Sequence, residues 1–201
     1  MSGSAPGTLG HHEIVVVRHG ETEWSVSGRH TGTTDLPLTE RGRERARALA
    51  GELAGWRFSL VLSSPLRRAR ETCELAGFGG VMELCDDLHE WDYGEYEGLT
   101  TPEIRETRPD WNLWTDGNPG GESPSQVAER ADRVIARLRG ADGDAIAFAH
   151  GHILRVLAAR WMEMDVSAGA RLVLSPGTIC TLGYERETQA ILSWNVTPER
   201  A

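Results

Sequence analysis

The chain has 201 residues, of which 39% are hydrophobic and 25% charged, a composition typical of a globular protein with one substantial core. Its 30 acidic and 21 basic residues give a net charge of −9, which argues against a nucleic-acid or anionic-membrane partner. No apolar run approaches the length of a membrane-spanning helix, and Cys73, Cys85 and Cys180 form no C-x-x-C pair. These features predict a cytoplasmic protein with reduced thiols.

Residues 1–12 lack the pattern of a signal peptide and are predicted to form a flexible N-terminal segment. A β-branched run at 13–18 then predicts a central parallel strand. The following stretch from 20 to 38 has no clear periodicity, which is typical of a connection kept for function. Thr39 is expected to cap a helix whose apolar residues recur at helical spacing up to Gly55.

Strand and helix patterns continue to alternate along the chain. The further predicted elements are a strand at 58–63, a helix opened by Ser64 and Pro65 and closed near Gly77, a short strand at 81–84, a helix capped by Ser123, a strand at 145–149, a helix at 153–162, and two strands at 178–184 and 190–194, in a hairpin. Residues 95–122, with one short helix expected after Pro102, are predicted to form a lid or insertion over the site. This order predicts a single three-layer α/β domain over residues 13–201, with a mostly parallel sheet covered by helices on both faces.

The predicted strand ends carry residues that packing does not require. The first strand runs into Arg18 and His19, and Arg68 follows the second strand by about one helical turn. The third strand leads to Glu90, and the strand at 145–149 leads to His150. Because ligands of open α/β sheets bind at the carboxyl ends of the strands, these five residues are expected to lie together.

Each of these residues has a structural alternative when it is taken alone. Arg68 lies among other arginines in a helix, where the side chain is usually solvated. Glu90 fits an ordinary surface carboxylate, and His150 fits a core histidine with a satisfied hydrogen bond. Their joint position at the ends of different strands favours a functional site.

The same residues lie in four blocks that resemble the signature of the histidine phosphatase superfamily, in its phosphoglycerate mutase-like branch. The blocks are 18–22 (RHGET), 64–72 (SPLRRARET), 88–98 (LHEWDYGEYEG) and 149–152 (AHGH). They follow the order of the family, the resemblance extends from Ile14 onward, and the four together are far more specific than any one.

The resemblance implies that His19 is the phosphorylated nucleophile and that Glu90 donates a proton to the leaving oxygen. The groups implied to bind the transferring phosphoryl group are Arg18, Arg68 and a protonated His150. The implied contacts to the rest of the phosphate or substrate are Ser25, Thr31, Gly32, Tyr93, Gly151 and His152. This inventory supplies a nucleophile, positive charge and a proton donor without a metal or other cofactor.

Departures from the family pattern favour a phosphatase over a cofactor-dependent phosphoglycerate mutase. Related mutases typically carry an Arg-Arg pair and a lysine in the lid, where this chain has the segment 99–102 (LTTP). They also often have asparagine at the positions of Ser25 and His152. A non-catalytic regulatory or binding domain on this fold is disfavoured, because none of the expected catalytic residues is missing.

Within the phosphatases, the strings GRHTG (28–32), TDLPLT (34–39) and WNLW (111–114) resemble broad-specificity acid phosphatases of actinobacteria and sedoheptulose-bisphosphatase-like enzymes. The expected partner is therefore a small phosphorylated substrate such as a sugar phosphate, and a homodimer stays open. Trp111 and Trp114 fit two roles, anchoring the lid or packing on the substrate, and anchoring is favoured.

Overall fold

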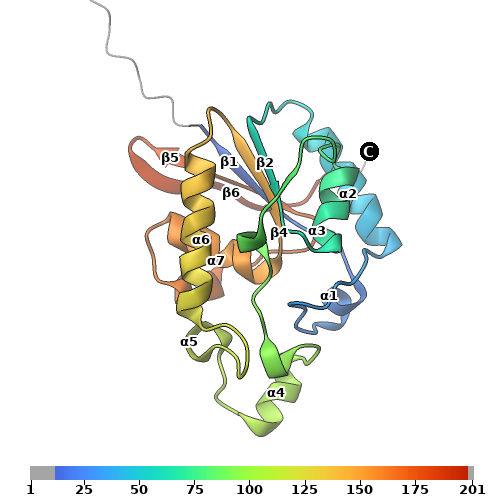
Figure 1. Ribbon diagram of the computed structural model, residues 1–201, viewed down its shortest axis with the longest axis vertical. Coiled ribbons are helices and arrows are strands. Elements are labelled where there is room, and N and C mark those ends of the chain that lie inside the picture. The colour runs from blue at the N-terminus through green and yellow to red at the C-terminus, as the bar shows by residue number, and fades with distance from the viewer. Residues whose placement is uncertain (1–11, 199–201) are drawn as a thin grey trace, which may run out of the picture.

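The computed structural model describes residues 12–198, which form a six-stranded mixed sheet with helices on both faces (Figure 1). The strands are β1 (Ile14–Arg18), β2 (Leu60–Ser63), β3 (Glu83–Leu84), β4 (Ala145–Ala149), β5 (Ile179–Glu185) and β6 (Thr188–Val196). Their order in the sheet is β3-β2-β4-β1-β5-β6. The first four are parallel, whereas β5 pairs antiparallel with β1 and β6 with β5. The predicted α/β class with a mostly parallel sheet is confirmed.

Two helices cover each face of the sheet. The α-helices are α1 (Glu23–Ser27), α2 (Glu40–Leu53), α3 (Arg67–Leu75), α4 (Thr101–Thr107), α5 (Leu113–Asp116), α6 (Pro124–Arg139) and α7 (Gly151–Trp161), and the 3-10 turns are η1 (Asp86–Leu88), η2 (Gly94–Tyr96) and η3 (Val166–Arg171). Helices α2 and α3 lie on one side and α6 and α7 on the other, while α1, α4 and α5 gather at one end of the molecule (Figure 1).

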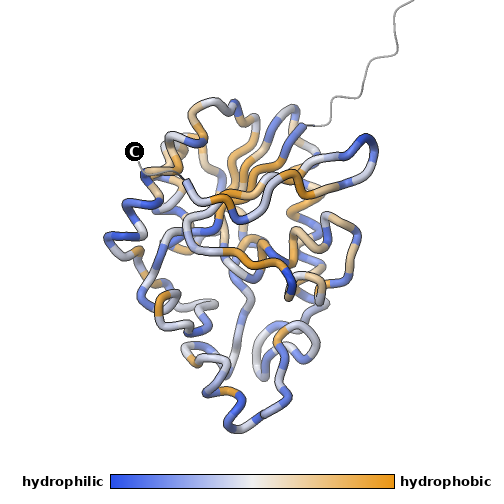
Figure 2. The backbone as a smooth tube through the Cα atoms, turned by 180° about the vertical axis from the view of Figure 1, so that it is seen from behind, coloured by the Kyte–Doolittle hydropathy of each residue, from blue (hydrophilic) through white to orange (hydrophobic). Residues whose placement is uncertain are grey.

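The central strands divide the core into two apolar clusters. Val15 and Val17 of β1 pack with the α2 side, and Ile14 and Val16 pack with the α6 and α7 side. All four are almost completely buried, so β1 is apolar on both faces, as a central parallel strand should be. Figure 2 shows the same pattern, with the hydrophobic segments concentrated in the middle strands.

Local sequence signals fix several helix starts. The side chain of Thr39 accepts from the backbone N–H of Gly42 at the start of α2, and Ser123 forms a capping box with Gln126 at the start of α6. The expectation that Ser64 caps α3 is wrong. That helix begins at Arg67, and the buried Ser64 hydroxyl accepts from the backbone N–H of Leu66 at 3.3 Å and lies 2.7 Å from Nε2 of His150.

The segment 95–122 contains α4, as predicted after Pro102, and a second short helix, α5, close to the two tryptophans. Tyr96, Ile104, Trp111 and Leu113 from this segment are buried in the larger apolar cluster. Trp111 is 3% exposed, which confirms its role as an anchor.

Apart from His12, the predicted flexible segment 1–12 lies outside the described residues; Nε2 of His12 lies 3.0 Å from the carbonyl oxygen of Leu138. Within residues 12–198 no helix is long and apolar enough to cross a membrane. Cys73, Cys85 and Cys180 are buried and unpaired.

Candidate active site

The register of the parallel strands brings the candidate residues together. Arg18 pairs with Ala149 across β1 and β4, and the backbone N–H of His19 donates to the carbonyl oxygen of Ala149 at 2.9 Å. On the other side of β4, the backbone N–H of Ser64 donates to Phe148 at 2.9 Å. His19, His150 and Ser64 therefore leave three adjacent strands at the same edge of the sheet.

His19 is buried and held in one tautomer. Its Nδ1 donates to the carbonyl oxygen of Gly20 at 2.7 Å, which leaves the Nε2 lone pair free to attack an electrophile. Burial, and then the positive charges of Arg68 and Arg18, lower the pKa of His19 well below its usual 6.5. The imidazole is therefore neutral at neutral and mildly acidic pH, as a nucleophile must be.

His150 lies beside His19, with 5.1 Å between the ring centroids. Nε of Arg68 donates to Nδ1 of His150 at 3.0 Å, and Nε2 of His150 lies 2.7 Å from the Ser64 hydroxyl. Burial, followed by the charge of Arg68, lowers the pKa of His150 well below 6.5. Nε of Arg68 occupies the lone pair that a second proton on His150 would need, so this arrangement favours the neutral imidazole, whereas the sequence led us to expect a protonated one.

Arg68 is fully buried and organises the loop after α1. Nη1 donates to the carbonyl oxygen of Thr34, and Nη2 donates to those of Thr31 and Gly32. Together with His150 these acceptors engage four of the five guanidinium N–H groups. Arg68 therefore positions the loop as well as carrying charge, but neither Arg68 nor His150 is among the residues that line the cavity described below.

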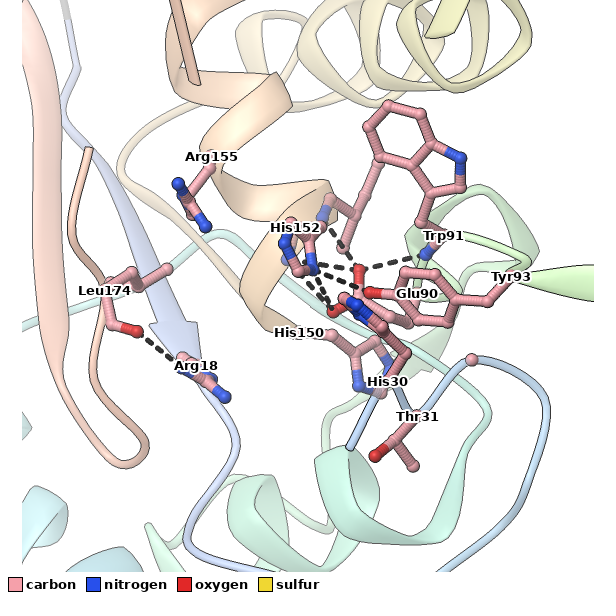
Figure 3. A network of polar contacts seen from close by, with 12 residues as sticks. Arg18, His30, Thr31, Glu90, Trp91, Tyr93, His150, His152, Arg155 and Leu174 are labelled. Atoms are coloured by element: carbon pink, nitrogen blue, oxygen red, sulfur yellow. Dashed lines mark hydrogen bonds and ion pairs between the residues drawn. The ribbon is translucent and has the colours of Figure 1, made fainter. Parts of the chain in front are cut away.

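Arg18 points into the site from the end of β1. Nη1 donates to the carbonyl oxygen of Leu174 (Figure 3), whereas the buried Nε has no hydrogen-bond partner among residues 12–198. A buried donor without a partner costs about 1–3 kcal/mol, which an anionic ligand would recover. A Cβ at Gly151 would lie 3.2 Å from Cζ of Arg18, so the glycine gives the guanidinium room.

The carboxyl group of Glu90 is fixed at the N-terminus of α7 (Figure 3). Oε1 accepts from the backbone N–H groups of Trp91 and Ile153, both at 2.9 Å, and Oε2 accepts from that of His152 at 2.9 Å. Glu90 is only 7% exposed, yet it lines the candidate cavity. The group is therefore held where it can exchange a proton with a ligand.

A buried ion pair holds the backbone on both sides of Glu90. Arg130 on α6 pairs with Glu122 at 2.8 Å and donates to the carbonyl oxygens of Asp87, His89 and Glu90. The Glu122 carboxylate in turn accepts from the backbone N–H of Asp92 at 2.9 Å. This clamp could not be predicted from the sequence, because nothing in the chain near residue 130 marks that arginine as different from its neighbours.

Replacing Arg130 with methionine should lower the free energy of unfolding by about 3–5 kcal/mol, because the Glu122 charge and three carbonyl groups lose their donor. Equilibrium unfolding in urea measures this change. Arg133→Met is the matched control, since Arg133 lies on the same helix and forms an exposed ion pair with Asp87. The control should have little effect, and equal effects of the two variants would contradict the clamp.

The strand ends enclose a cavity of about 200 Å³, lined by Arg18, His19, Thr22, Ser25, Gly28, Arg29, His30, Thr31, Glu90, Tyr93, Gly151, His152, Arg155 and Leu174. Five of the six expected substrate contacts are in this lining, namely Ser25, Thr31, Tyr93, Gly151 and His152. Gly32 is buried behind it, and its N–H donates to Glu97. A Cβ at Gly32 would lie 2.7 Å from the carbonyl oxygen of Trp91, so this position is set by packing.

The hydroxyl of Ser25 is hydrogen-bonded within the protein, because its Oγ donates to the carbonyl oxygen of Thr22 and accepts from the N–H of Thr22. The Tyr93 hydroxyl lies 2.6 Å from Nδ1 of His152. Burial and then Glu90 raise the pKa of Tyr93 well above 10, and burial and then Arg155 lower that of His152 well below 6.5. Tyr93 and His152 therefore form a hydrogen bond between two neutral groups.

The lining also contains residues that the sequence analysis did not single out, chiefly His30, Arg155 and Leu174. A larger cavity of about 720 Å³ is lined by α2 side chains with Thr197 and Pro198, and it includes none of the residues at the strand ends.

The site combines a free imidazole lone pair with two guanidinium groups and a fixed carboxyl group. This combination suits the transfer of an anionic group. The family comparison agrees: this chain belongs to the histidine phosphatase superfamily (branch 1), whose sequence profile matches residues 14–197. It is thus an enzyme of that superfamily, as the four sequence blocks predicted.

Individual relatives narrow the comparison. An acid phosphatase of Mycobacterium tuberculosis is 42% identical over 191 residues, which cover 92% of this chain and 93% of the relative. Sedoheptulose 1,7-bisphosphatase of Saccharomyces cerevisiae is 39% identical over 187 residues, which cover 76% of this chain and 68% of the relative. A solved structure of a Mycobacterium tuberculosis open reading frame product is 40% identical, covers 94% of this chain and 99% of its own, and matches with a TM-score of 0.89.

Proposed function

We propose that this enzyme is a phosphatase that hydrolyses small phosphate monoesters through a phosphohistidine on His19, without a metal. The observation that carries the proposal is the hydrogen bond from Nδ1 of His19 to Gly20, which leaves a neutral Nε2 at the floor of a cavity lined by Arg18. The acid phosphatase and bisphosphatase relatives support hydrolysis of phosphate esters.

In the first step Nε2 of His19 attacks phosphorus and the bond to the leaving oxygen breaks. The unpartnered Nε of Arg18 and the remaining N–H of Arg68 donate to the equatorial phosphoryl oxygens, where charge is concentrated in the transition state. Fixed donors of this kind are each worth on the order of 3–4 kcal/mol. Glu90 gives its proton to the leaving oxygen, so that an alcohol departs instead of an alkoxide.

In the second step water attacks the phosphohistidine and Glu90 takes up its proton. The P–N bond breaks, phosphate leaves, and His19 returns to its neutral form. His150 acts in both steps by holding Arg68, which agrees with its neutral state and its burial behind His19. Cavity-lining Ser25, Thr31, Tyr93, Gly151 and His152 contact the substrate, and 95–122 is the lid.

The pH dependence should show that His19 does not limit activity in acid. Because the pKa of His19 is lowered well below 6.5, the nucleophile stays neutral as the pH falls, and kcat/KM should hold or rise between about pH 7 and pH 5. A tenfold fall in kcat/KM per pH unit below about pH 6.5 would mean that an unperturbed histidine limits the reaction. Initial rates with p-nitrophenyl phosphate in buffers of constant ionic strength measure the profile.

Phosphate release in the presence of EDTA tests the proposed function. The panel contains p-nitrophenyl phosphate, sugar mono- and bisphosphates and 3-phosphoglycerate. Release from at least one substrate in excess EDTA supports a metal-independent phosphatase. No release, combined with isomerisation of 3-phosphoglycerate in the presence of 2,3-bisphosphoglycerate, would replace the phosphatase with the mutase.

The cytoplasmic location, the homodimer and the absence of a nucleic-acid partner remain predictions from the sequence.

A further inference from the structure

Arg155 is a cation in the cavity wall that the phosphoryl chemistry does not use. It lies on α7, one turn after His152, and its guanidinium is fixed on two sides. Nε donates to the carbonyl oxygen of Gly169 at 2.9 Å and Nη2 to that of Ala170 at 3.1 Å, while Cζ lies 4.6 Å from the ring centroid of Trp114. Nη1 has no partner among the described residues, so an oriented amino group is left for a ligand.

The charges that line the cavity do not balance. Glu90 is the single acidic residue in the lining, which also contains Arg18, Arg29 and Arg155. Arg29 has an acidic partner, since it lies 3.7 Å from Glu103. Arg18 and Arg155 form no ion pair within residues 12–198, in a protein whose net charge is −9.

Two unpaired guanidiniums in one cavity indicate two anionic groups in the ligand. Arg18 stands next to His19 and belongs to the transferring phosphoryl group. Arg155 lies with His152 on the α7 side of the same space, as Figure 3 shows for Arg18, His152 and Arg155. His152, whose Nδ1 is hydrogen-bonded to the Tyr93 hydroxyl, adds a second polar group to that wall.

On the basis of the proposed phosphatase activity, we propose that Arg155 binds a second anionic group of the substrate. The substrate class is then a phosphate monoester with another phosphate or carboxylate on the leaving group, as in a sugar bisphosphate or a phosphorylated hydroxy acid. A guanidinium that is fixed by two carbonyl oxygens and an aromatic ring loses little conformational entropy when a ligand binds. A charge-assisted hydrogen bond from such a guanidinium is strong.

Matched substrate pairs test this subsite. Fructose 1,6-bisphosphate is compared with fructose 1-phosphate, and 3-phosphoglycerate with glycerol 3-phosphate, so that each pair differs by one anionic group. In at least one pair, the wild type should favour the substrate with the second anionic group by about ten- to a hundredfold in kcat/KM. Which pair shows the preference tells whether phosphate or carboxylate is the second group.

Variants then assign the preference to Arg155. Arg155→Met should bring the ratio of the two kcat/KM values close to one, mainly by raising KM for the substrate with the second anionic group. Arg155→Lys should keep part of the preference for that substrate. Arg171→Met, an exposed arginine on η3, should keep the wild-type ratio. Thermal midpoints of all variants separate loss of the subsite from loss of the fold.

The outcomes for the subsite and for the phosphatase are distinct. If the wild type hydrolyses p-nitrophenyl phosphate but shows no preference in either pair, the subsite is overturned and the phosphatase stands. A preference that survives in Arg155→Met also overturns it. If the wild type releases phosphate from no substrate at all, the proposed function fails, and the subsite, which rests on it, fails with it.

Discussion

His19→Ala should lower kcat for phosphate release by a factor on the order of 10⁴ to 10⁶, because the variant has no group that can form the covalent intermediate. The effect should be similar for every substrate, since the nucleophile attacks the same phosphorus in each. Steady-state kinetics with p-nitrophenyl phosphate and a sugar phosphate measure it. The loss should appear in kcat, because Arg18 and Arg68 would still bind the phosphoryl group.

His12→Ala is the matched control for this variant. His12 bonds only the Leu138 carbonyl among the described contacts and lies outside the cavity lining, so its removal should leave kcat within about twofold of the wild type. A His19→Ala variant that keeps more than about one hundredth of the wild-type kcat would contradict covalent catalysis by His19.

Glu90→Gln should lower kcat/KM by about 10²–10⁴-fold for alkyl phosphates, because an amide cannot donate a proton to an alkoxide in this way. With p-nitrophenyl phosphate the loss should be much smaller, since p-nitrophenolate is a stable leaving group without protonation. The difference between the two substrates separates a role in proton transfer from a general effect on the fold. The kcat/KM values of both substrates measure it, because kcat/KM reports the first step alone and not the later attack of water.

Glu95→Gln is the control for Glu90→Gln, because Glu95 is exposed and lies in the same loop. It should leave both rates near those of the wild type. Equal losses of kcat/KM in Glu90→Gln on the two substrates would indicate that Glu90 only holds the start of α7. Its hydrogen bonds to His152 and Ile153 make that the main structural alternative.

Much of the fold follows from local sequence patterns. The β-branched run before Arg18 and the apolar run before His150 predicted the two central strands within one or two residues, and Thr39 and Ser123 marked two helix starts. Short elements escaped prediction. Helix α1 has only five residues and begins at a capping box between Thr22 and Ser25, within the stretch 20–38 where the sequence shows no clear periodicity.

The candidate site could be predicted as a set of residues, because parallel strand ends converge at one edge of the sheet. Its electrostatics could not. The neutral state of His150 depends on the direction in which Arg68 points its Nε, and the support of Glu90 depends on Arg130, which lies on a different helix. Arg155 escaped notice because its surroundings, η3 and Trp114, are distant in sequence.

The central claim is that His19 becomes phosphorylated during turnover, and trapping the phosphoenzyme tests it most directly. Wild-type enzyme is mixed with a ³²P-labelled phosphate ester, quenched in alkali to preserve phosphohistidine, and digested for peptide mapping. The account predicts label on the peptide that contains His19, and no label in His19→Ala. Label on another residue, or rapid turnover of the wild type with no phosphoenzyme formed on the time scale of a single turnover, would contradict it.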